Sequence, residues 1–476
     1  MKKENVLWYD SPADLKNWNE ALPVGNGRLG AMGWGVPGKE MLGLNEDSLW
    51  SGYERDRTNP EAAESLQEAR RLIFEGRCAE AEELIRRQML GEYGESYLPL
   101  GNLNIVYKNL EDSEAFNGGG VQNYRRSLDL EEAVAYVDFD AEGVHYSREM
   151  FVTYPGQAIL VSLGASEPVM DLVVSLGSLL KCRMKEGPEG LDFRGKCPEH
   201  LDPGYIREGE EAVVWGYRGK RFSGKIRVLE GDGKVSVEDG RLWIRGCSRA
   251  VLSVEAVRPA SLEGDYEAIR KAHVDDYRKI FDSVELYLGE QLEQPTDVRL
   301  ENLRAGGEDN GLFGLYFQYG RYLMIASSRK GSFPANLQGI WSWQWQAPWS
   351  SNWTTNINLE MNYWPAMSCG LEECMEAYLS YVEKLAEHGE HTAAVNYRCR
   401  GSVQHHNADA WYTTTPMGMG YGSERGEKGC VSWSMWPMGL AWLAQEFYHY
   451  YEYSGDRDFL RRKAYPMFRA NALFLV

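Results

Sequence analysis

Residues 353–365 read WTTNINLEMNYWP and combine three carboxamides, one carboxylate and three aromatic rings in thirteen positions. Its β-branched residues Thr354 and Thr355 favour an extended backbone. Because side chains two apart on an extended segment point the same way, we expect Asn356 and Asn358 to present their amides to one point. An amide oxygen accepts hydrogen bonds and carries no titratable charge. The pair could therefore hold a water molecule or a sugar hydroxyl at any ordinary pH.

The flanking sequence favours a sugar-binding site over the alternative, in which the amides cap turns or satisfy buried backbone groups. Upstream, residues 336–349 read NLQGIWSWQWQAPW, and downstream, residues 404–411 read QHHNADAW. Tryptophan alternating with Gln, Asn and His makes poor core material, because every buried amide needs a hydrogen-bond partner. Flat apolar rings can instead cover the C–H faces of a pyranose while planar polar groups bond its hydroxyls.

Further motifs extend along the chain in a fixed order. They are LWY at 7–9, ALPVGNGRLGAM at 21–32, LNEDSLWSG at 44–52, YLPLGNL at 97–103 and YGRYLMIASSR at 319–329. Each motif alone is unspecific, but the ordered set, together with residues 353–365, resembles glycoside hydrolase family 95. The resemblance covers nearly the whole chain.

The resemblance implies an N-terminal antiparallel β-sandwich, a helical linker and a six-hairpin (α/α) barrel. It implies an inverting α-1,2-L-fucosidase or a related α-L-galactosidase, in which Asn356 and Asn358 position the attacking water. The family's general acid Glu and base-side Asp are expected beyond residue 476. Only about half of a six-hairpin barrel fits between residue 300 and the final residues 474–476, which carry no helix stop signal. We therefore expect the catalytic domain to be incomplete in this chain.

Eight further residues are predicted to contact the sugar. They are Thr354, Glu360, Trp341, His405, His406, Asn407, Asp409 and Trp436. For Glu360 and Asp409, bonding to sugar hydroxyls or bracing of loops is favoured over a role as replacement acid. Trp436 could equally belong to the core.

Thr354 carries a prediction about substrate choice, because family members vary between His and smaller residues two positions before the first Asn of the pair. A threonine leaves room for one more oxygen at C6 and offers a hydroxyl to bond it. We expect α-L-galactosides to be accepted as well as α-L-fucosides. The alternative is that Thr354 only fixes the backbone and fucose remains the main substrate.

The residue pattern divides the chain into three parts. Residues 1–284 are mainly β, with alternating runs such as 103–107, two amphipathic helices within 60–90 broken at Gly76, and an exit helix from 266. Residues 285–298 are polar and form a linker. Residues 299–476 have a helical period, and the run 312–328 is apolar nearly all round, which predicts a fully buried helix.

The segment GNGRLG at 25–30 fits a dinucleotide-binding pattern, but no βαβ unit surrounds it, so we interpret it as a tight turn in the sandwich. The net charge of −19 disfavours nucleic acid and anionic membranes as partners and suits a neutral fucosylated or L-galactosylated oligosaccharide. No cofactor and no metal site is expected, since the His405–His406 pair lacks a second ligand cluster.

No secretory signal and no apolar run long enough to span a membrane are visible, and the eight scattered cysteines suit a reducing compartment, so a cytoplasmic location is expected. Two other function classes stay open. One is a non-catalytic carbohydrate-binding protein, and the other is a disaccharide phosphorylase, which would need a phosphate pocket near the barrel mouth.

Overall fold

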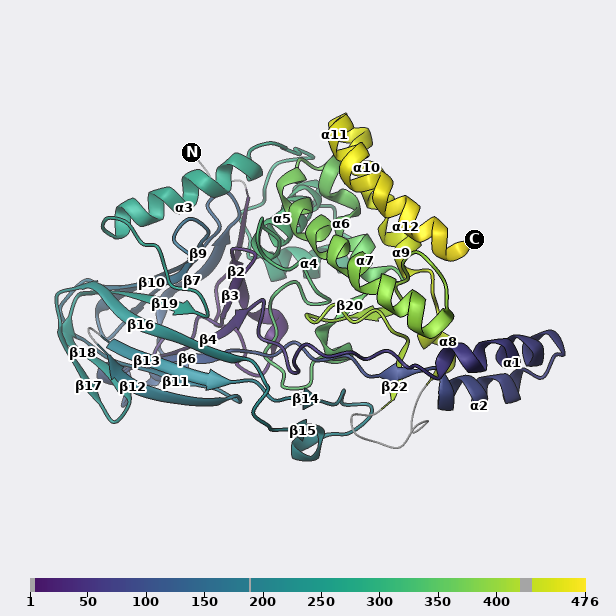
Figure 1. Ribbon diagram of the computed structural model, residues 1–476. Coiled ribbons are helices and arrows are strands. Elements are labelled where there is room, and N and C mark those ends of the chain that lie inside the picture. The colour runs from purple at the N-terminus through teal and green to yellow at the C-terminus, as the bar shows by residue number, and fades with distance from the viewer. Residues whose placement is uncertain (1–4, 188–189, 420–429) are drawn as a thin grey trace.

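A computed structural model describes residues 5–187, 190–419 and 430–476. It divides into a β-sandwich formed by the N-terminal part and a helical region formed by the C-terminal part (Figure 1). This arrangement confirms the predicted fold class of an antiparallel sandwich followed by helices. Among the described residues, no helix is both long and apolar enough to cross a membrane.

The larger sheet has nine antiparallel strands in the described part of the chain. In spatial order they are β1 (Val6–Tyr9), β7 (Gln122–Asp129), β8 (Val134–Ala141), β9 (Val144–Thr153), β10 (Ala158–Ala165), β19 (Arg249–Ala256), β16 (Arg221–Gly231), β13 (Gly190–Lys196) and β12 (Lys181–Gly187). Helix α3 (Tyr266–Phe281) lies across this sheet and buries Tyr266 and Ile269 against strands β8, β9, β10 and β19 (Figure 1).

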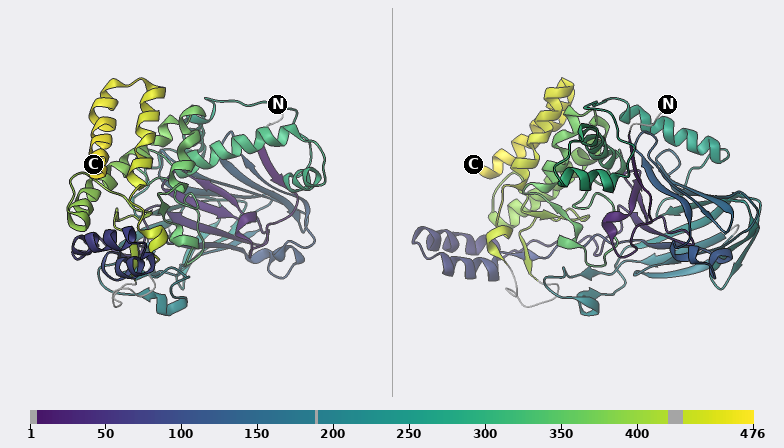
Figure 2. Two further views of the ribbon diagram at one scale, coloured as in Figure 1. Left: turned by 90° about the vertical axis from the view of Figure 1, so that its right-hand side faces the viewer. Right: turned by 180° about the vertical axis from the view of Figure 1, so that it is seen from behind.

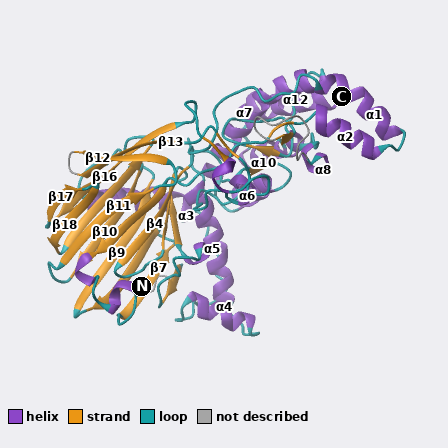
Figure 3. Ribbon diagram, turned by 90° about the horizontal axis from the view of Figure 1, so that it is seen from below, coloured by secondary structure: helices purple, strands orange, loops and turns teal. Residues whose placement is uncertain are grey.

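The second sheet has seven antiparallel strands among the described residues and faces the first (Figure 3). Its order is β17 (Lys234–Glu238), β18 (Arg241–Cys247), β11 (Met170–Gly177), β6 (Gly101–Tyr107), β4 (Lys39–Glu46), β3 (Leu29–Gly33) and β2 (Leu22–Gly25). On β6, Leu103, Ile105 and Tyr107 are fully buried while the residues between them are half-buried. This period-two pattern confirms the strand predicted at 103–107 and shows why the two sheets stack.

An arm formed by residues 51–98 leaves the sandwich and reaches the helical region. It carries the two predicted helices, α1 (Ala62–Phe74) and α2 (Cys78–Gln88), which project as a hairpin (Figure 1, and Figure 2 from behind). Gly76 separates them in the left-handed region at φ 76°, where a side chain would be strained. The arm also contributes β5 (Gly91–Glu92), which pairs with β22 (Met417–Met419) of the helical region.

The helical region contains α4 (Thr296–Arg304), α5 (Asn310–Ser327), α6 (Asn358–Ser368), α7 (Met375–Tyr397), α8 (Val431–Ser434), α9 (Gly439–Leu443), α10 (Gln445–Ser454), α11 (Arg457–Phe459) and α12 (Tyr465–Leu475). Helices α10 and α12 form a hairpin that turns at Gly455, which has φ 66° (Figure 2). Two short strand pairs complete the fold. They join β14 (His200–Leu201) to β15 (Val213–Val214), and β20 (Trp353–Thr354) to β21 (Asn407–Ala408).

The prediction that the apolar run 312–328 is buried all round is wrong for one face. Leu315, Tyr322 and Ile325 are buried, but Phe313 is 50% and Tyr316 is 73% exposed. Both exposed rings line a largely apolar hollow of about 880 Å³ between α5, α6 and the sandwich. The sequence pattern did not predict that this face of α5 is exposed. Helical periodicity shows which positions are hydrophobic, but it does not show which other elements cover them.

The glycines at 25–30 allow the sandwich to approach the helical region. Gly25 and Gly30 pair across the β2–β3 hairpin, which confirms the predicted tight turn. A Cβ atom at Gly25 would lie 2.4 Å from the carbonyl oxygen of Ala326, and one at Gly27 would lie 2.7 Å from the Arg329 nitrogen. The hairpin therefore packs directly against the end of α5, and the two regions share one continuous core.

Candidate active site

The amide pair lies where a short strand turns into a helix. Only Trp353 and Thr354 are extended; residues 355–357 form a turn, and Asn358 is the first residue of α6. The prediction of an extended segment through Asn358 is therefore wrong. Among the described residues, the bonds of the strand pair extend no further than Thr355, whose N–H donates to the His406 carbonyl (2.8 Å). The helical bonds begin where the Met361 N–H donates to the Ile357 carbonyl (2.7 Å).

Both amides nevertheless remain available. Asn358 is exposed at the N-terminus of α6, and Asn356 is half-buried beside it. The Asn356 Oδ1 atom is buried and has no hydrogen-bond partner among the described residues. Since buried polar atoms rarely stay unpaired, this oxygen is a candidate acceptor for a ligand or an ordered water.

An aromatic cluster supports the strand that leads to the pair. The Trp353 ring is 1% exposed and stacks on Trp50 of the sandwich, with centroids 4.7 Å apart. On its other sides it contacts Tyr381 (4.5 Å) and Phe333 (5.3 Å), and its indole N–H donates to the Pro334 carbonyl (3.0 Å). This packing fixes the position of β20 from which the amides extend.

The segment 404–409 lies beside the pair through the β20–β21 contact, in which Thr354 faces Asn407. Asn407 Oδ1, Gln404 Oε1 and His406 Nδ1 are buried and have no hydrogen-bond partner in the described part of the chain. Like Asn356 Oδ1, these atoms are candidate partners for an ordered water or a ligand hydroxyl. The half-buried His406 ring lies 5.2 Å from the Trp433 ring, and burial lowers the pKa of His406, so its imidazole is neutral at pH 7.

His405 has a different role from the predicted one. Its Nδ1 atom lies 2.6 Å from the Thr414 carbonyl, which can only accept, so Nδ1 carries the proton. Its Nε2 atom then accepts from the Tyr397 hydroxyl (2.5 Å). Burial lowers the pKa of His405 to about 4. Because both ring nitrogens are occupied and the side chain is fully buried, the geometry does not support His405 as a sugar ligand.

Asp409 is likewise enclosed. It is fully buried, and its carboxylate accepts from the Glu95 N–H (2.9 Å), the Trp411 N–H (3.0 Å) and the Thr413 hydroxyl (2.9 Å). The Arg57 guanidinium lies 3.6 Å away. These contacts agree with the loop-bracing alternative and not with a sugar contact.

The partners of Asp409 belong to a buried charged network that the sequence did not predict. Arg57 pairs with Glu95 (2.9 Å) and donates to Thr413 (2.7 Å), and His200 lies between Glu95 (3.2 Å) and Asp202 (2.9 Å). Burial would lower the pKa of His200, but the two carboxylates raise it to about 9. The only sequence feature that pointed to this network was the position of Glu95 just before the motif at 97–103.

Glu360 is a buried carboxyl without a cation. It lies on the first turn of α6, is fully buried, and neither carboxyl oxygen has a hydrogen-bond partner among the described residues. Burial, with a smaller contribution from the Glu446 carboxylate, raises the pKa of Glu360 to about 8. The side chain is therefore mostly protonated at neutral pH and could donate a hydrogen bond.

The remaining predicted residues have mixed environments. Trp341 is 4% exposed, and its indole N–H donates to the Val24 carbonyl (2.9 Å), so it joins the sandwich to the helical region. Thr354 is 8% exposed and its hydroxyl donates to Asn352 Oδ1 (3.0 Å). Trp436 is half-buried beside Trp442, with ring centroids 6.3 Å apart.

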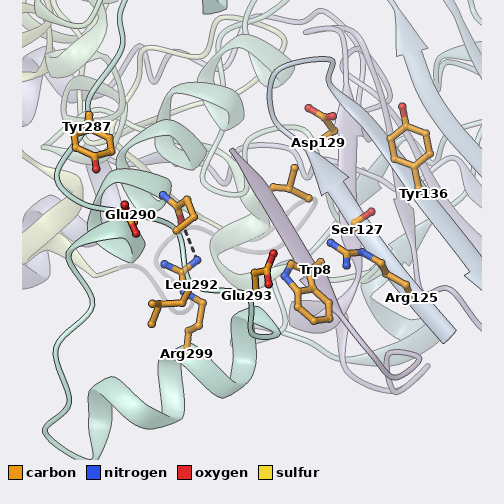
Figure 4. A pocket seen from close by; sticks show the side chains of 12 residues that line it. Trp8, Arg125, Ser127, Asp129, Tyr136, Tyr287, Glu290, Leu292, Glu293 and Arg299 are labelled. Atoms are coloured by element: carbon orange, nitrogen blue, oxygen red, sulfur yellow. Dashed lines mark hydrogen bonds between the residues drawn. The ribbon is translucent and has the colours of Figure 1, made fainter. Parts of the chain in front are cut away.

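Another hollow lies away from these segments. It measures about 850 Å³ between the outer strands β1, β7 and β8 and residues 287–293 (Figure 4). Its wall includes Trp8, on whose ring Arg125 lies at 4.2 Å, and Arg299, which donates to Gln291 (2.8 Å). No residue of 353–360 or 404–409 lines it. In the described part of the chain, no group of three His, Cys, Asp or Glu residues could hold a metal ion.

Each of the two regions of the chain matches the model of a known protein family. Residues 265–476 match the glycosyl hydrolase family 95 catalytic domain, and residues 7–260 match the glycosyl hydrolase family 65 N-terminal domain. The chain belongs to glycoside hydrolase family 95. This finding confirms the resemblance seen in the motifs of the sequence.

Two curated relatives of the family 95 chain extend this assignment. Alpha-L-fucosidase 2 of Arabidopsis thaliana is 35% identical across 97% of the chain and 57% of its own length. Probable alpha-fucosidase A of Aspergillus niger is 29% identical across 98% of the chain and 60% of its own length. The chain thus spans somewhat more than half the length of each relative.

Among solved structures, a putative kojibiose phosphorylase from the human microbiome superposes with a TM-score of 0.57 at 10% identity. The superposition covers the whole chain and 59% of that structure. At this identity the similarity shows a shared fold of sandwich and helices, and no shared activity.

Proposed function

We propose that the protein is an inverting glycosidase that releases α-1,2-linked L-fucose from oligosaccharides, with a water molecule oriented by Asn356 and Asn358. Support comes from family 95 membership and from the names of the two relatives, one called an alpha-L-fucosidase and the other a probable alpha-fucosidase. The observation that carries the site is the buried Oδ1 of Asn356, which has no hydrogen-bond partner among the described residues and lies two positions before the exposed Asn358.

The reaction needs two proton-handling groups besides the amides. Water attacks the anomeric carbon on the face opposite the glycosidic bond and loses a proton to a base as the bond to the leaving oxygen breaks. A general acid protonates that leaving oxygen, with roughly 6.5–9.5 Å between the two carboxyl groups. Following the family resemblance, we place the acid Glu and the base-side Asp outside the 476 residues.

The amides contribute through orientation. An amide oxygen can accept one hydrogen of the water and an amide NH2 group can donate to the water oxygen, which leaves the second hydrogen for the base and directs a lone pair at the anomeric carbon. This orientation matters more in the transition state than in substrate binding. Because an amide does not titrate, this part of the machinery works unchanged across ordinary pH values.

Proton NMR on an active preparation tests the proposal, with 2′-fucosyllactose as substrate. Inversion predicts that β-L-fucose appears first and then mutarotates. First appearance of α-L-fucose would contradict inversion. Absence of hydrolysis, with binding of the trisaccharide retained, would favour the non-catalytic carbohydrate-binding alternative.

A second candidate activity is hydrolysis of α-L-galactosides, which Thr354 favours. Its hydroxyl hydrogen is directed at Asn352, but the hydroxyl oxygen keeps acceptor capacity for an O6–H group. A disaccharide phosphorylase remains the third alternative. Cleavage that depends on inorganic phosphate and yields a sugar phosphate would support it.

A further inference from the structure

Three consecutive non-glycine residues just before the amide pair adopt a left-handed backbone. Trp349 has φ 49° and ψ 37°, Ser350 has φ 56° and ψ 13°, and Ser351 has φ 46°. For L-residues this conformation brings the Cβ atom too close to the following carbonyl oxygen, so each residue is strained. Such strain persists only where surrounding contacts hold it, and it concentrates at functional sites.

Specific hydrogen bonds hold this turn from both regions. The Ser350 N–H donates to the Ala347 carbonyl (2.9 Å), and the Tyr97 N–H of the sandwich arm donates to the Ser350 carbonyl (3.0 Å). The Ser351 hydroxyl donates to Asn336 Oδ1 (3.0 Å). Ser350 and Ser351 are buried, so the backbone under Trp349 is rigid.

The turn exposes the ring that it carries. The Trp349 side chain is 66% exposed, whereas Trp341 and Trp353 on the same segment are 4% and 1% exposed. Among the described residues, the indole of Trp349 makes no hydrogen bond and no contact with another aromatic ring. Exposing an indole and straining the backbone both oppose folding.

The ring is also near the candidate active site along the chain. Trp349 precedes β20 by four residues and Asn356 by seven. Seven residues span at most about 25 Å even when fully extended. The indole therefore lies within about 25 Å of the amide pair, a distance that a bound oligosaccharide of several residues can span.

We propose that Trp349 is a stacking platform for a pyranose residue of the bound glycan, on the leaving-group side of the cleaved bond. The flat, uncharged indole matches the C–H face of a neutral sugar. The rigid turn preorganises the ring, so little conformational entropy is lost when the sugar binds. This inference rests on the proposed function for its position relative to the cleaved bond.

Kinetics on two substrates test the proposal: an α-L-fucosyl oligosaccharide and an aryl α-L-fucoside that has no sugar leaving group. For Trp349→Ala we expect KM for the oligosaccharide to rise about tenfold, with kcat and both constants for the aryl fucoside unchanged. Trp349→Phe should restore part of the affinity. Trp364→Ala is the matched control, because Trp364 is 46% exposed on α6 and belongs to no proposed site.

A fluorescence titration with fucosylated oligosaccharide separates this inference from the proposed reaction. If no substrate is hydrolysed but the glycan perturbs the indole signal of the wild type and not of Trp349→Ala, the platform stands and the fucosidase proposal fails. Equal kinetic loss on both substrates, or unchanged constants on both, would overturn the platform. A fall in Tm for Trp349→Ala that Trp349→Phe reverses, without a change in glycan affinity, would also overturn it by showing a packing role.

Discussion

Replacing Arg57 with alanine tests whether the sandwich arm holds the loop at the candidate active site. Arg57 is 7% exposed and lies between two fully buried carboxylates, Glu95 at 2.9 Å and Asp409 at 3.6 Å. It also donates to the Thr413 hydroxyl (2.7 Å). The substitution leaves both carboxylates buried and removes their shared cation.

The expected loss follows from what remains around each carboxylate. Removing one partner of a buried ion pair typically costs about 3–5 kcal/mol, because the other charge stays uncompensated. Here Glu95 keeps His200 and Arg55 nearby, and Asp409 keeps its hydrogen bonds. We therefore expect a loss near the lower end of that range, about 3 kcal/mol.

Urea denaturation and hydrogen exchange measure the effect. The midpoint of unfolding should fall, and amides of residues 404–415 should exchange faster than those of the sandwich, because the contact with the arm is local to that loop. Arg77→Ala is the matched control: Arg77 pairs with Glu80 (2.7 Å) at the exposed tip of the arm, where an ion pair contributes little. An unchanged midpoint together with unchanged exchange in 404–415 would refute the bracing role of Arg57.

Four further predictions concern single side chains. Asn356→Ala or Asn358→Ala should lower kcat on the order of 10²-fold with little change in KM, because an oriented water matters mainly in the transition state; near-normal kcat in steady-state assays would contradict the assignment. His200 has a folded pKa of about 9, above its usual value of about 6.5, so its stabilising contribution is complete below about pH 6.5 and is lost as pH rises through 9. His200→Gln should flatten urea-measured stability in that window, and an unaltered slope would show that another group titrates there. Glu360 has a folded pKa of about 8, above the unfolded value of about 4.3, so it destabilises the folded state increasingly as pH rises from 4.3 to 8. Glu360→Gln should therefore stabilise the fold at pH 8 and not at pH 4. Equal effects of the substitution at both pH values would argue against a raised pKa. Thr354→His should shift the ratio of kcat/KM for p-nitrophenyl α-L-galactoside over α-L-fucoside towards the fucoside, and an unchanged ratio would mean that Thr354 does not contact C6.

Much of the fold follows from local patterns in the sequence. The alternation at 103–107 specifies a strand with one buried face, and Gly76 between two amphipathic runs specifies a helical hairpin. These features depend only on residues that are close in sequence. Side chains return to the same face every two positions in a strand and every 3.6 positions in a helix, whatever the rest of the molecule does. The ordered motifs likewise give the family, because they depend on residue identity alone.

Local sequence patterns did not predict the backbone conformation of residues 353–358. The β-branched residues favour extension, yet the strand pair with residues 407–408 includes only Trp353 and Thr354, and α6 begins at Asn358. The β-propensity of a few residues stabilises a conformation less than the hydrogen bonds that the folded chain makes. The local preference therefore does not decide the conformation of this segment. The same limit explains the exposed face of α5, whose neighbours are set by the fold.

The residue types of the candidate site can be read from the linear motifs, but only the folded chain shows which of them can meet a ligand. His405 and Asp409 look like binding residues in a linear motif, but Tyr397, Glu95 and Arg57 occupy their polar atoms. Two of those partners lie more than 300 positions away in the chain, where no local pattern can reveal them. A buried polar group must find its partner wherever the fold brings one, so availability for binding is a property of the folded molecule.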